Sequence, residues 1–140
     1  MLTRWLIGSL AVAAVVTGAN LAAAEGAGIF AQTAPGLWEM SGAPGSKTAP
    51  RQCVADVESL AQYEHRGRAC TRRVVRQTES SAVIEYSCAG QGFGRSELTL
   101  ITPRSLRIQT QGIAGGLPFN YVLQARRVGD CPGQKSATRH

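Results

Sequence analysis

Four cysteines are the residues whose type and spacing predict the clearest chemistry. They are separated by gaps of 16, 17 and 42 residues, and no two form a C-x-x-C pair: Cys53, Cys70, Cys88 and Cys131. Structural zinc sites usually take two ligands from one tight turn, so this spacing disfavours a metal centre. An even number of cysteines in a small secreted domain is typical of disulfides. We therefore expect two disulfide bonds and no metal site.

Acid–base catalysis would depend on very few residues. Of the two histidines, His140 is the last residue, and His65 follows Glu64 in a charged stretch. Nothing near His65, such as a G-x-S-x-G turn, indicates a Ser-His-Asp triad. The two aspartates, Asp56 and Asp130, are interpreted as a helix cap and a turn residue.

Two further patterns superficially suggest chemistry. Glu85 and Glu97 could form the paired carboxylates of a glycosidase, but in the hairpin predicted below Glu85 already has Arg73 opposite it. The glycine-rich stretch 90–94 resembles a phosphate-binding loop. No βαβ unit surrounds it and no helix follows it, so we interpret it as a corner between strands. We therefore expect no catalytic residue, no cofactor and no enzymatic activity.

A basic cluster is the one surface feature with a predicted ligand. It contains five arginines: Arg66, Arg68, Arg72, Arg73 and Arg76. Because arginine pairs with carboxylates and phosphates, Arg72, Arg73 and Arg76 are a candidate anion site for an anionic lipid or an acidic glycan. Arg72 and Arg76 would share one face of a strand and Arg73 the other, so a solvated edge is the alternative. Nucleic acid is a poor partner for an exported protein, despite the net charge of +6.

Export is predicted by the first 24 residues. An apolar run at 5–16 follows Arg4, and small residues ending at Ala24 form an A-x-A cleavage site before Glu25. The run is shorter than the roughly 20 apolar residues that span a bilayer. We therefore expect a Sec-type signal peptide cleaved after Ala24, a periplasmic or secreted protein, and no integral membrane segment after cleavage.

The remaining 116 residues correspond to one domain. We expect a flexible leader at 25–34, a single disulfide-stapled β domain at 35–132 and a disordered tail at 133–140. Before Cys70 the pattern predicts strands at 37–41 and 51–54, on either side of a loop at 42–50. Trp38 and Met40 would face the core. Asp56 would cap a short helix to about Glu64, with an apolar stripe formed by Val57, Leu60 and Ala61.

From Cys70 onward apolar residues alternate, which predicts strands. Segments 70–77 and 82–88 form a hairpin in which Cys70 lies opposite Cys88. This register sets four further pairs opposite one another: Val74 and Ile84, Arg72 and Tyr86, Val75 and Val83, and Arg73 and Glu85. Apolar residues then face apolar ones and opposite charges pair. Of the three pairings that four cysteines allow, the register favours Cys70–Cys88, which leaves Cys53–Cys131.

In the last third of the chain, the alternation of apolar residues predicts further strands of the same sheet. Segments 96–102 and 105–111 form a second hairpin, followed by a loop at 112–118 and a strand at 119–127, with Phe119, Tyr121 and Leu123 facing inward. The predicted fold is mainly β: an antiparallel meander of six or seven strands, curved or a half barrel, with one short helix and two disulfides. One face is apolar and needs a cover, which the helix and the curvature would supply.

Five short motifs together resemble a known family. They are Pro35–Glu39 (PGLWE), Arg51–Cys53 (RQC) before the short helix, Cys70, Tyr86–Cys88 (YSC) and the closing Gly129–Cys131 (GDC). The chain resembles the domain of unknown function 3617 family of small exported proteobacterial proteins over nearly all of its mature length. The resemblance implies the location and the fold, and it implies no catalytic residue because the family has no established activity.

Two function classes remain open. The first is a non-enzymatic protein of the cell envelope that binds a lipid, a glycan or a protein on a curved sheet, or has a structural role. The second is an inhibitor or chaperone-like partner of a periplasmic enzyme, which would act through an exposed loop such as 112–118. A deep apolar cavity would favour the first class, and a flat sheet with one protruding rigid loop would favour the second.

Overall fold

Seven strands form one antiparallel sheet in the computed structural model, which describes residues 27–133. In chain order the elements are α1 (Ile29–Gln32), β1 (Gly36–Ser41), β2 (Arg51–Val54), the 3-10 helix η1 (Val57–His65), β3 (Cys70–Gln77), β4 (Ser81–Cys88), β5 (Gly92–Thr102), β6 (Ser105–Ala114) and β7 (Leu117–Gly129). The order across the sheet is β2-β1-β7-β6-β5-β4-β3. The predicted fold class, a mainly β antiparallel sheet with two disulfides, is confirmed.

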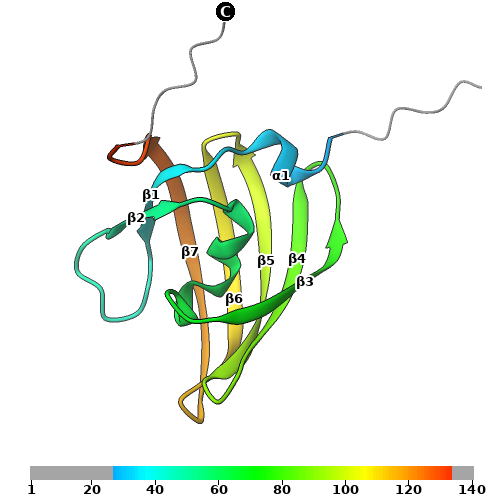
Figure 1. Cartoon of the computed structure of the whole chain (residues 1–140), viewed down its shortest axis with the longest axis vertical. Helices are drawn as coiled ribbons and strands as arrows, with labels where there is room; N and C mark the ends of the chain where they lie inside the picture. The colour runs from blue at the N-terminus through cyan, green and yellow to red at the C-terminus, as the bar shows by residue number, and fades with distance from the viewer. Residues whose placement is uncertain (1–26, 134–140) are drawn as a thin grey trace, which may run out of the picture.

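The sheet curls around η1 and stays open. Figure 1 shows the long strands β4–β7 as a twisted layer, with η1, β2 and the start of β3 in front of it. β2 and β3 are the two edge strands, so the sheet does not close into a barrel. The half-barrel curvature lets one short helix cover most of the apolar face, as the amphipathic strands require.

The β3–β4 hairpin has the predicted register at its open end. Cys70 pairs with Cys88, and Val74 pairs with Ile84. The Cys70–Cys88 disulfide joins Cα atoms 4.2 Å apart, and the Cys53–Cys131 disulfide joins Cα atoms 5.5 Å apart. Both predicted disulfides are therefore confirmed. The register argument succeeded because cross-strand neighbours lie within the Cα distance that a disulfide tolerates.

A β-bulge overturns the predicted register at the other end of this hairpin. The register shifts between Val74 and Arg76, so that Arg76 rather than Val75 pairs with Val83. The extra residue increases the local twist of the edge strand. Because cross-strand partners share a face, Arg76 lies on the same face as Arg73, and the prediction that it shares a face with Arg72 is wrong.

The second hairpin and the last strand are longer than predicted. Leu98 pairs with Ile108 as expected from their shared face. The predicted loop at 112–118 is wrong, because β6 runs to Ala114 and β7 begins at Leu117. The connection is the two-residue turn Gly115-Gly116, whose φ angles of 56° and 79° suit a glycine pair in a tight hairpin.

The segment expected to be a flexible leader is partly built into the domain. Residues 29–32 form α1, and the Ile29 side chain is fully buried in the core. Its N–H donates to the Thr78 carbonyl oxygen at 3.1 Å, and the Gln32 amide donates to the Glu79 carbonyl oxygen at 2.6 Å. The physical reason for this correction is the pair of apolar residues Ile29 and Phe30 in a glycine- and alanine-rich stretch, since both pack into or against the core. The predicted signal peptide (1–24) and nearly all of the predicted tail (133–140) lie outside the described residues.

The core lies between η1 and the concave face of the sheet. Trp38 and Met40 are fully buried, as predicted, and so is Leu60 of η1. Asp56 caps η1 by accepting a hydrogen bond from the Glu58 N–H, which confirms the predicted helix start. Further fully buried large side chains come from β4 to β7: Ile84, Leu98, Leu106, Ile108 and Leu123.

Candidate functional site

Four small residues in the middle of the sheet make room for the end of η1. Gly94 of β5 pairs with Gly112 of β6, and two residues further along Ser96 pairs with Thr110. Residues two apart on a strand share a face, so all four lie under η1. The buried Ser96 hydroxyl donates to the Ala61 carbonyl oxygen at 2.5 Å, and its oxygen is hydrogen-bonded to the Thr110 hydroxyl at 2.8 Å. These bonds fix η1 above β5 and β6.

Aromatic rings from the flanking strands cover the glycine pair. Tyr86 of β4 pairs with Gly94, and Phe119 of β7 pairs with Gly112. A Cβ atom on Gly94 would lie 2.5 Å from the Tyr86 ring, and one on Gly112 would lie 2.9 Å from the Phe119 ring. The His65 ring packs edge-on against both, at centroid distances of 5.4 Å and 6.0 Å. The glycines are therefore required for the close approach of three rings to the sheet.

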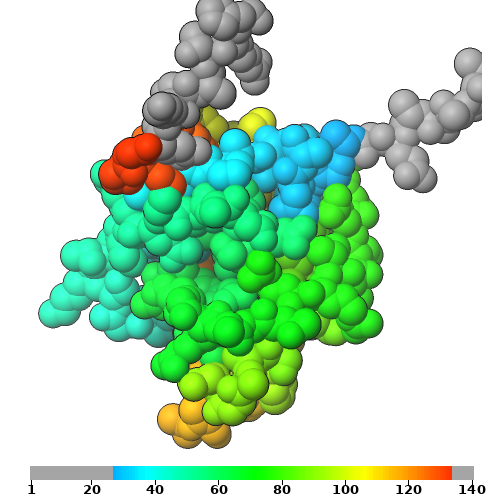
Figure 2. All heavy atoms as spheres, in the orientation of Figure 1, coloured from blue at the N-terminus to red at the C-terminus, as the bar shows by residue number. Residues whose placement is uncertain are grey.

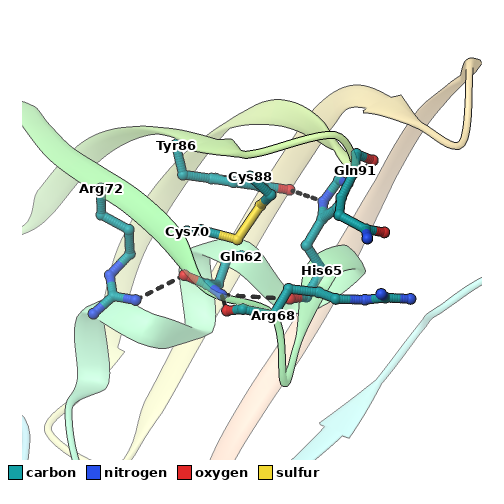
Figure 3. The surroundings of a disulfide bond; sticks show 8 residues. All are labelled: Gln62, His65, Arg68, Cys70, Arg72, Tyr86, Cys88 and Gln91. Carbon is teal, nitrogen blue, oxygen red and sulfur yellow. Dashed lines mark hydrogen bonds between the residues drawn. A yellow bond between two sulfur atoms is a disulfide. The ribbon is translucent and has the colours of Figure 1, made fainter.

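His65 is held through both of its ring nitrogens (Figure 3). Nε2 lies 3.1 Å from the Gln91 carbonyl oxygen, and Nδ1 lies 3.1 Å from the Tyr86 hydroxyl. A carbonyl oxygen only accepts, so Nε2 donates to Gln91, and in the neutral ring Nδ1 then accepts from the Tyr86 hydroxyl. Burial, followed by the charge of Glu64, raises the pKa of Tyr86 to about 12, which keeps its hydroxyl protonated as a donor. This histidine connects η1 to the β4–β5 turn.

Gln62 connects the same end of η1 to the edge strand β3 (Figure 3). Its side-chain amide donates to the Arg68 carbonyl oxygen at 3.2 Å, and its Oε1 accepts from Arg72 at 2.7 Å. The Arg72 guanidinium also donates to Asp56 at 2.8 Å. The buried Gln62 thus positions the loop between η1 and β3, which carries Arg66 and Arg68.

An open cleft of about 670 Å³ lies beside this cluster. The cleft is bordered by the β1–β2 loop, the end of η1 and the half of β7 nearest the β6–β7 turn. Figure 2 shows the β1–β2 loop (cyan) and the β6–β7 end (orange) projecting on either side of the green atoms between them. The residues that line the cleft are Ala43, Pro44, Gly45, Ser46, Pro50, Tyr63, Glu64, Arg66, Pro118, Phe119, Asn120 and Tyr121.

One wall of the cleft is aromatic and holds a carboxylate. The Tyr121 hydroxyl donates to the Glu64 carboxylate at 2.5 Å, and the Tyr121 and Phe119 rings lie 5.9 Å apart. Burial first, then this hydrogen bond and the charge of Glu64, raise the pKa of Tyr121 well above its usual range. The tyrosine therefore stays a donor, and Glu64 is engaged within the wall.

Arg66 supplies the positive charge of the cleft. Its guanidinium lies 4.4 Å from the centre of the Tyr63 ring and donates to the Tyr63 carbonyl oxygen at 3.0 Å. Within residues 27–133 it makes no ion pair. A guanidinium has five N–H donors, so most of them are available to a ligand in the cleft.

A second hollow, of about 660 Å³, lies at the same end of the sheet and shares Phe119 and Asn120 with the cleft. Phe93, which is 56% exposed, forms part of its wall. The charged residues in its lining, Glu85 and Arg95, pair with each other at 2.5 Å. This hollow therefore offers apolar contact but no free charge.

The predicted anion-binding residues are not brought together as one site. Arg72 binds Asp56 and Gln62, and Arg73 binds Glu85 at 2.9 Å. Arg76 lies beyond the bulge and makes no ion pair with any residue that the structure describes. Anion binding by these three residues stays a prediction, and the geometry gives two of them structural partners.

Sequence reasoning missed the cluster around His65. The sequence shows His65 only as part of a charged stretch, whereas in the structure η1 ends at this residue and its side chain is buried. A usable signal was present in the two glycines, since a glycine inside a strand often marks the close approach of another group. The partner of that approach cannot be read from the sequence, because His65 and Phe119 meet only across the sheet.

Three general features of residues 27–133 bear on metals, membranes and redox environment. Among residues 27–133, no group of histidine, cysteine, aspartate and glutamate side chains could hold a metal ion. No helix in that range is long and apolar enough to cross a membrane. The two disulfides are typical of an oxidising compartment.

Comparison with known proteins gives a family and no activity. No curated protein and no solved structure matches the chain. One family model, described as a protein of unknown function, matches residues 33–131, which include both disulfides, η1 and all seven strands. The chain belongs to the DUF3617 family of proteins of unknown function.

Proposed function

We propose that this chain is an exported, non-catalytic protein of the cell envelope that binds its partner in the cleft beside β7. The observation that carries the proposal is the composition of the cleft: aromatic walls, an arginine that makes no ion pair with any residue in 27–133, and a volume of about 670 Å³. Ligand sites typically occupy about 300–1,000 Å³ and combine apolar walls with a few polar groups.

The engagement of the acid–base residues supports a non-catalytic role. His65 uses both ring nitrogens within the fold. Glu39 and Glu85 each accept hydrogen bonds from two arginines, and Asp56 caps η1. A general base needs a free lone pair within reach of a substrate proton. Each of these groups has hydrogen-bond partners within the fold, which supports a structural role for them.

Export is supported by the apolar run at 5–16, the A-x-A sequence before Glu25 and the two disulfides. Expression of the full chain in a bacterial host should give a periplasmic product that begins at Glu25. Mass spectrometry of the isolated protein would identify its N-terminal residue. A product that retains residues 1–24 would contradict export by cleavage.

Binding in the cleft can be located by NMR. Isotope-labelled protein would be titrated with fractions of periplasmic extract, with lipids and proteins separated. We expect shifts concentrated on the backbone amides of 63–66 and 119–121. They should be reduced in Arg66→Gln and retained in Arg104→Gln, whose arginine lies in the β5–β6 turn. Shifts centred elsewhere, or equal losses in both variants, would contradict the proposed site.

A further inference from the structure

Within residues 27–133, no strand pairs with one edge of half of β7. β1 pairs with β7 from Ser41 opposite Gln124 to Leu37 opposite Gly129. β7 continues from residue 123 back to Leu117, paired only with β6. Figure 1 shows this part of β7 extending beyond β1, while the β1–β2 loop turns away from the sheet. The unpaired segment borders the cleft, whose lining includes four consecutive residues of β7.

The direction of the backbone groups on this edge follows from contacts with β1. The Gln124 carbonyl oxygen accepts from the Ser41 hydroxyl at 3.4 Å. A Cβ atom on Gly42 would lie 2.5 Å from the Val122 carbonyl oxygen. Backbone groups of alternate residues point to the same neighbouring strand. The N–H and C=O of Asn120 and the C=O of Pro118 therefore point to the open edge.

The backbone groups of the odd-numbered residues of β7 point to β6, which confirms the alternation. The Arg127 N–H donates to the Arg104 carbonyl oxygen at 2.8 Å, at the start of β6. Pro118 fits this arrangement because its missing N–H would have faced the open edge, where no strand partner is lost. Asn120 is then the residue that offers both an N–H and a C=O to the cleft.

We propose that the cleft binds an extended, acidic peptide segment of a partner protein, which adds as a strand to the open edge of β7. An exposed strand edge is a template for strand addition, in which the main chain supplies affinity and side-chain pockets supply specificity. The aromatic rings of Tyr121 and Phe119 would contact apolar side chains of the peptide. Arg66, which has no ion pair among the described residues, would pair with its carboxylate.

This inference rests on the proposed function and names its ligand class. A small molecule or a lipid could occupy the same cleft without using the strand edge. Strand addition requires the Asn120 N–H, whereas those ligands require only the walls and Arg66. The backbone of Asn120 therefore separates the alternatives.

The test uses a pair of substitutions at one position. Asn120→Pro removes the edge N–H and leaves the ladder to β6 intact, while Asn120→Ala removes only the side chain. The probe is a blocked heptapeptide of alternating valine and threonine with one central glutamate, and its glutamine form is the charge control. We expect Asn120→Pro to weaken binding at least tenfold and Asn120→Ala less than twofold, measured by isothermal titration calorimetry.

The charge contribution is measured in the same way. Arg66→Gln should weaken binding of the glutamate peptide about threefold to tenfold and should leave the glutamine peptide unchanged. NMR contacts between peptide Hα atoms and the Asn120 amide would locate the added strand. Unfolding of Asn120→Pro is checked by circular dichroism, and if it occurs, a peptide N-methylated at alternate positions replaces the variant.

Several outcomes would overturn the inference. Equal effects of Asn120→Pro and Asn120→Ala would exclude strand addition. Binding of a lipid or glycan that depends on Arg66 but tolerates Asn120→Pro would keep the proposed function and reject the peptide. Concentration-dependent dimers that Asn120→Pro abolishes would make a second copy of this chain the occupant. Failure of every ligand to shift cleft residues would reject both proposals.

Discussion

At one edge of the sheet Glu39 of β1 lies between Arg51 of β2 and Arg126 of β7, and at the other edge Glu85 of β4 lies between Arg73 of β3 and Arg95 of β5. Each edge also carries one disulfide: Cys53–Cys131 at the first and Cys70–Cys88 at the second. Each edge is therefore held by one glutamate between two arginines and by one disulfide. The edges differ in the length of the loop that the disulfide closes.

The disulfides close loops of very different length. Cys53–Cys131 spans 78 residues and ties the short strand β2 to the chain just after β7, whereas Cys70–Cys88 spans 18 residues within one hairpin. Loop-closure entropy grows with the logarithm of loop length. The first edge thus depends on a long covalent constraint, and the second is already held in place by a local hairpin.

The edges also differ in their connection to η1. β2 ends at Val54 and η1 begins at Val57, so the first edge is joined to the helix through the chain. β3 follows η1 in the chain as well, and it is also joined to the helix through side chains, since Arg72 donates to Asp56 and to Gln62. In addition, α1 is hydrogen-bonded to the β3–β4 turn, where the Ile29 N–H donates to the Thr78 carbonyl oxygen. The second edge therefore adds several noncovalent contacts to its short disulfide.

The largest expected effect separates the two disulfides. Cys53→Ser with Cys131→Ser should cost about 4.5 kcal/mol, and Cys70→Ser with Cys88→Ser about 3 kcal/mol, before any strain. The first pair should therefore lower the melting temperature more, as measured by calorimetry. Peptide mapping without reduction verifies the pairing in the parent protein. A greater loss from the hairpin disulfide would show that the edges do not differ in the way described.

The packing of α1 against the second edge predicts the next largest effect. Ile29→Ala removes a fully buried side chain and should cost about 2–4 kcal/mol of unfolding free energy. The matched control is Ile101→Ala, where the side chain is 58% exposed and the change should stay within about 0.5 kcal/mol. Urea unfolding measures both variants. Equal stability of the two would mean that α1 does not contribute to the core.

Arg72 and Arg51 test the noncovalent connections of the two edges. Arg72→Ala leaves the buried Gln62 Oε1 without its donor and should cost about 1–3 kcal/mol. Arg51 makes an exposed ion pair with Glu39, so Arg51→Ala should cost no more than about 1 kcal/mol. Urea midpoints of the two variants give the comparison. The reverse order would place the critical contact at the first edge.

The smallest expected effect is on the loss of folding stability at low pH. Hydrogen bonds from Arg51 and from Arg73, respectively, hold the pKa values of Glu39 and Glu85 below the usual range. A lowered folded-state pKa gives stability that is present above the unfolded value, near pH 4, and is lost as pH falls through the folded value. Glu39→Gln and Glu85→Gln should each flatten the loss of stability below about pH 4. Unchanged acid profiles in both would show that neither carboxylate contributes.

The hairpin register was predictable because its determinants are local. Cys70 and Cys88 flank a short polar turn, and the alternation of apolar residues fixes which residues face each other. The bulge at Val75 was not predictable, because one inserted residue costs little locally and is selected by the curvature of the whole sheet. The burial of Ile29 was missed for a similar reason, since its partners are supplied by the β3–β4 hairpin.

The class of fold, the Cys70–Cys88 disulfide and the helix start at Asp56 follow from the sequence alone, since each depends on periodicity or on neighbours close in the chain. The Cys53–Cys131 disulfide then follows by elimination, although it spans 78 residues. The position of the candidate site depends on the tertiary structure. Its cleft combines Arg66 at the end of η1 with Asn120 on the open edge of β7. These groups are far apart in the chain and meet because the sheet curls, and β1 ends before it can cover the rest of β7.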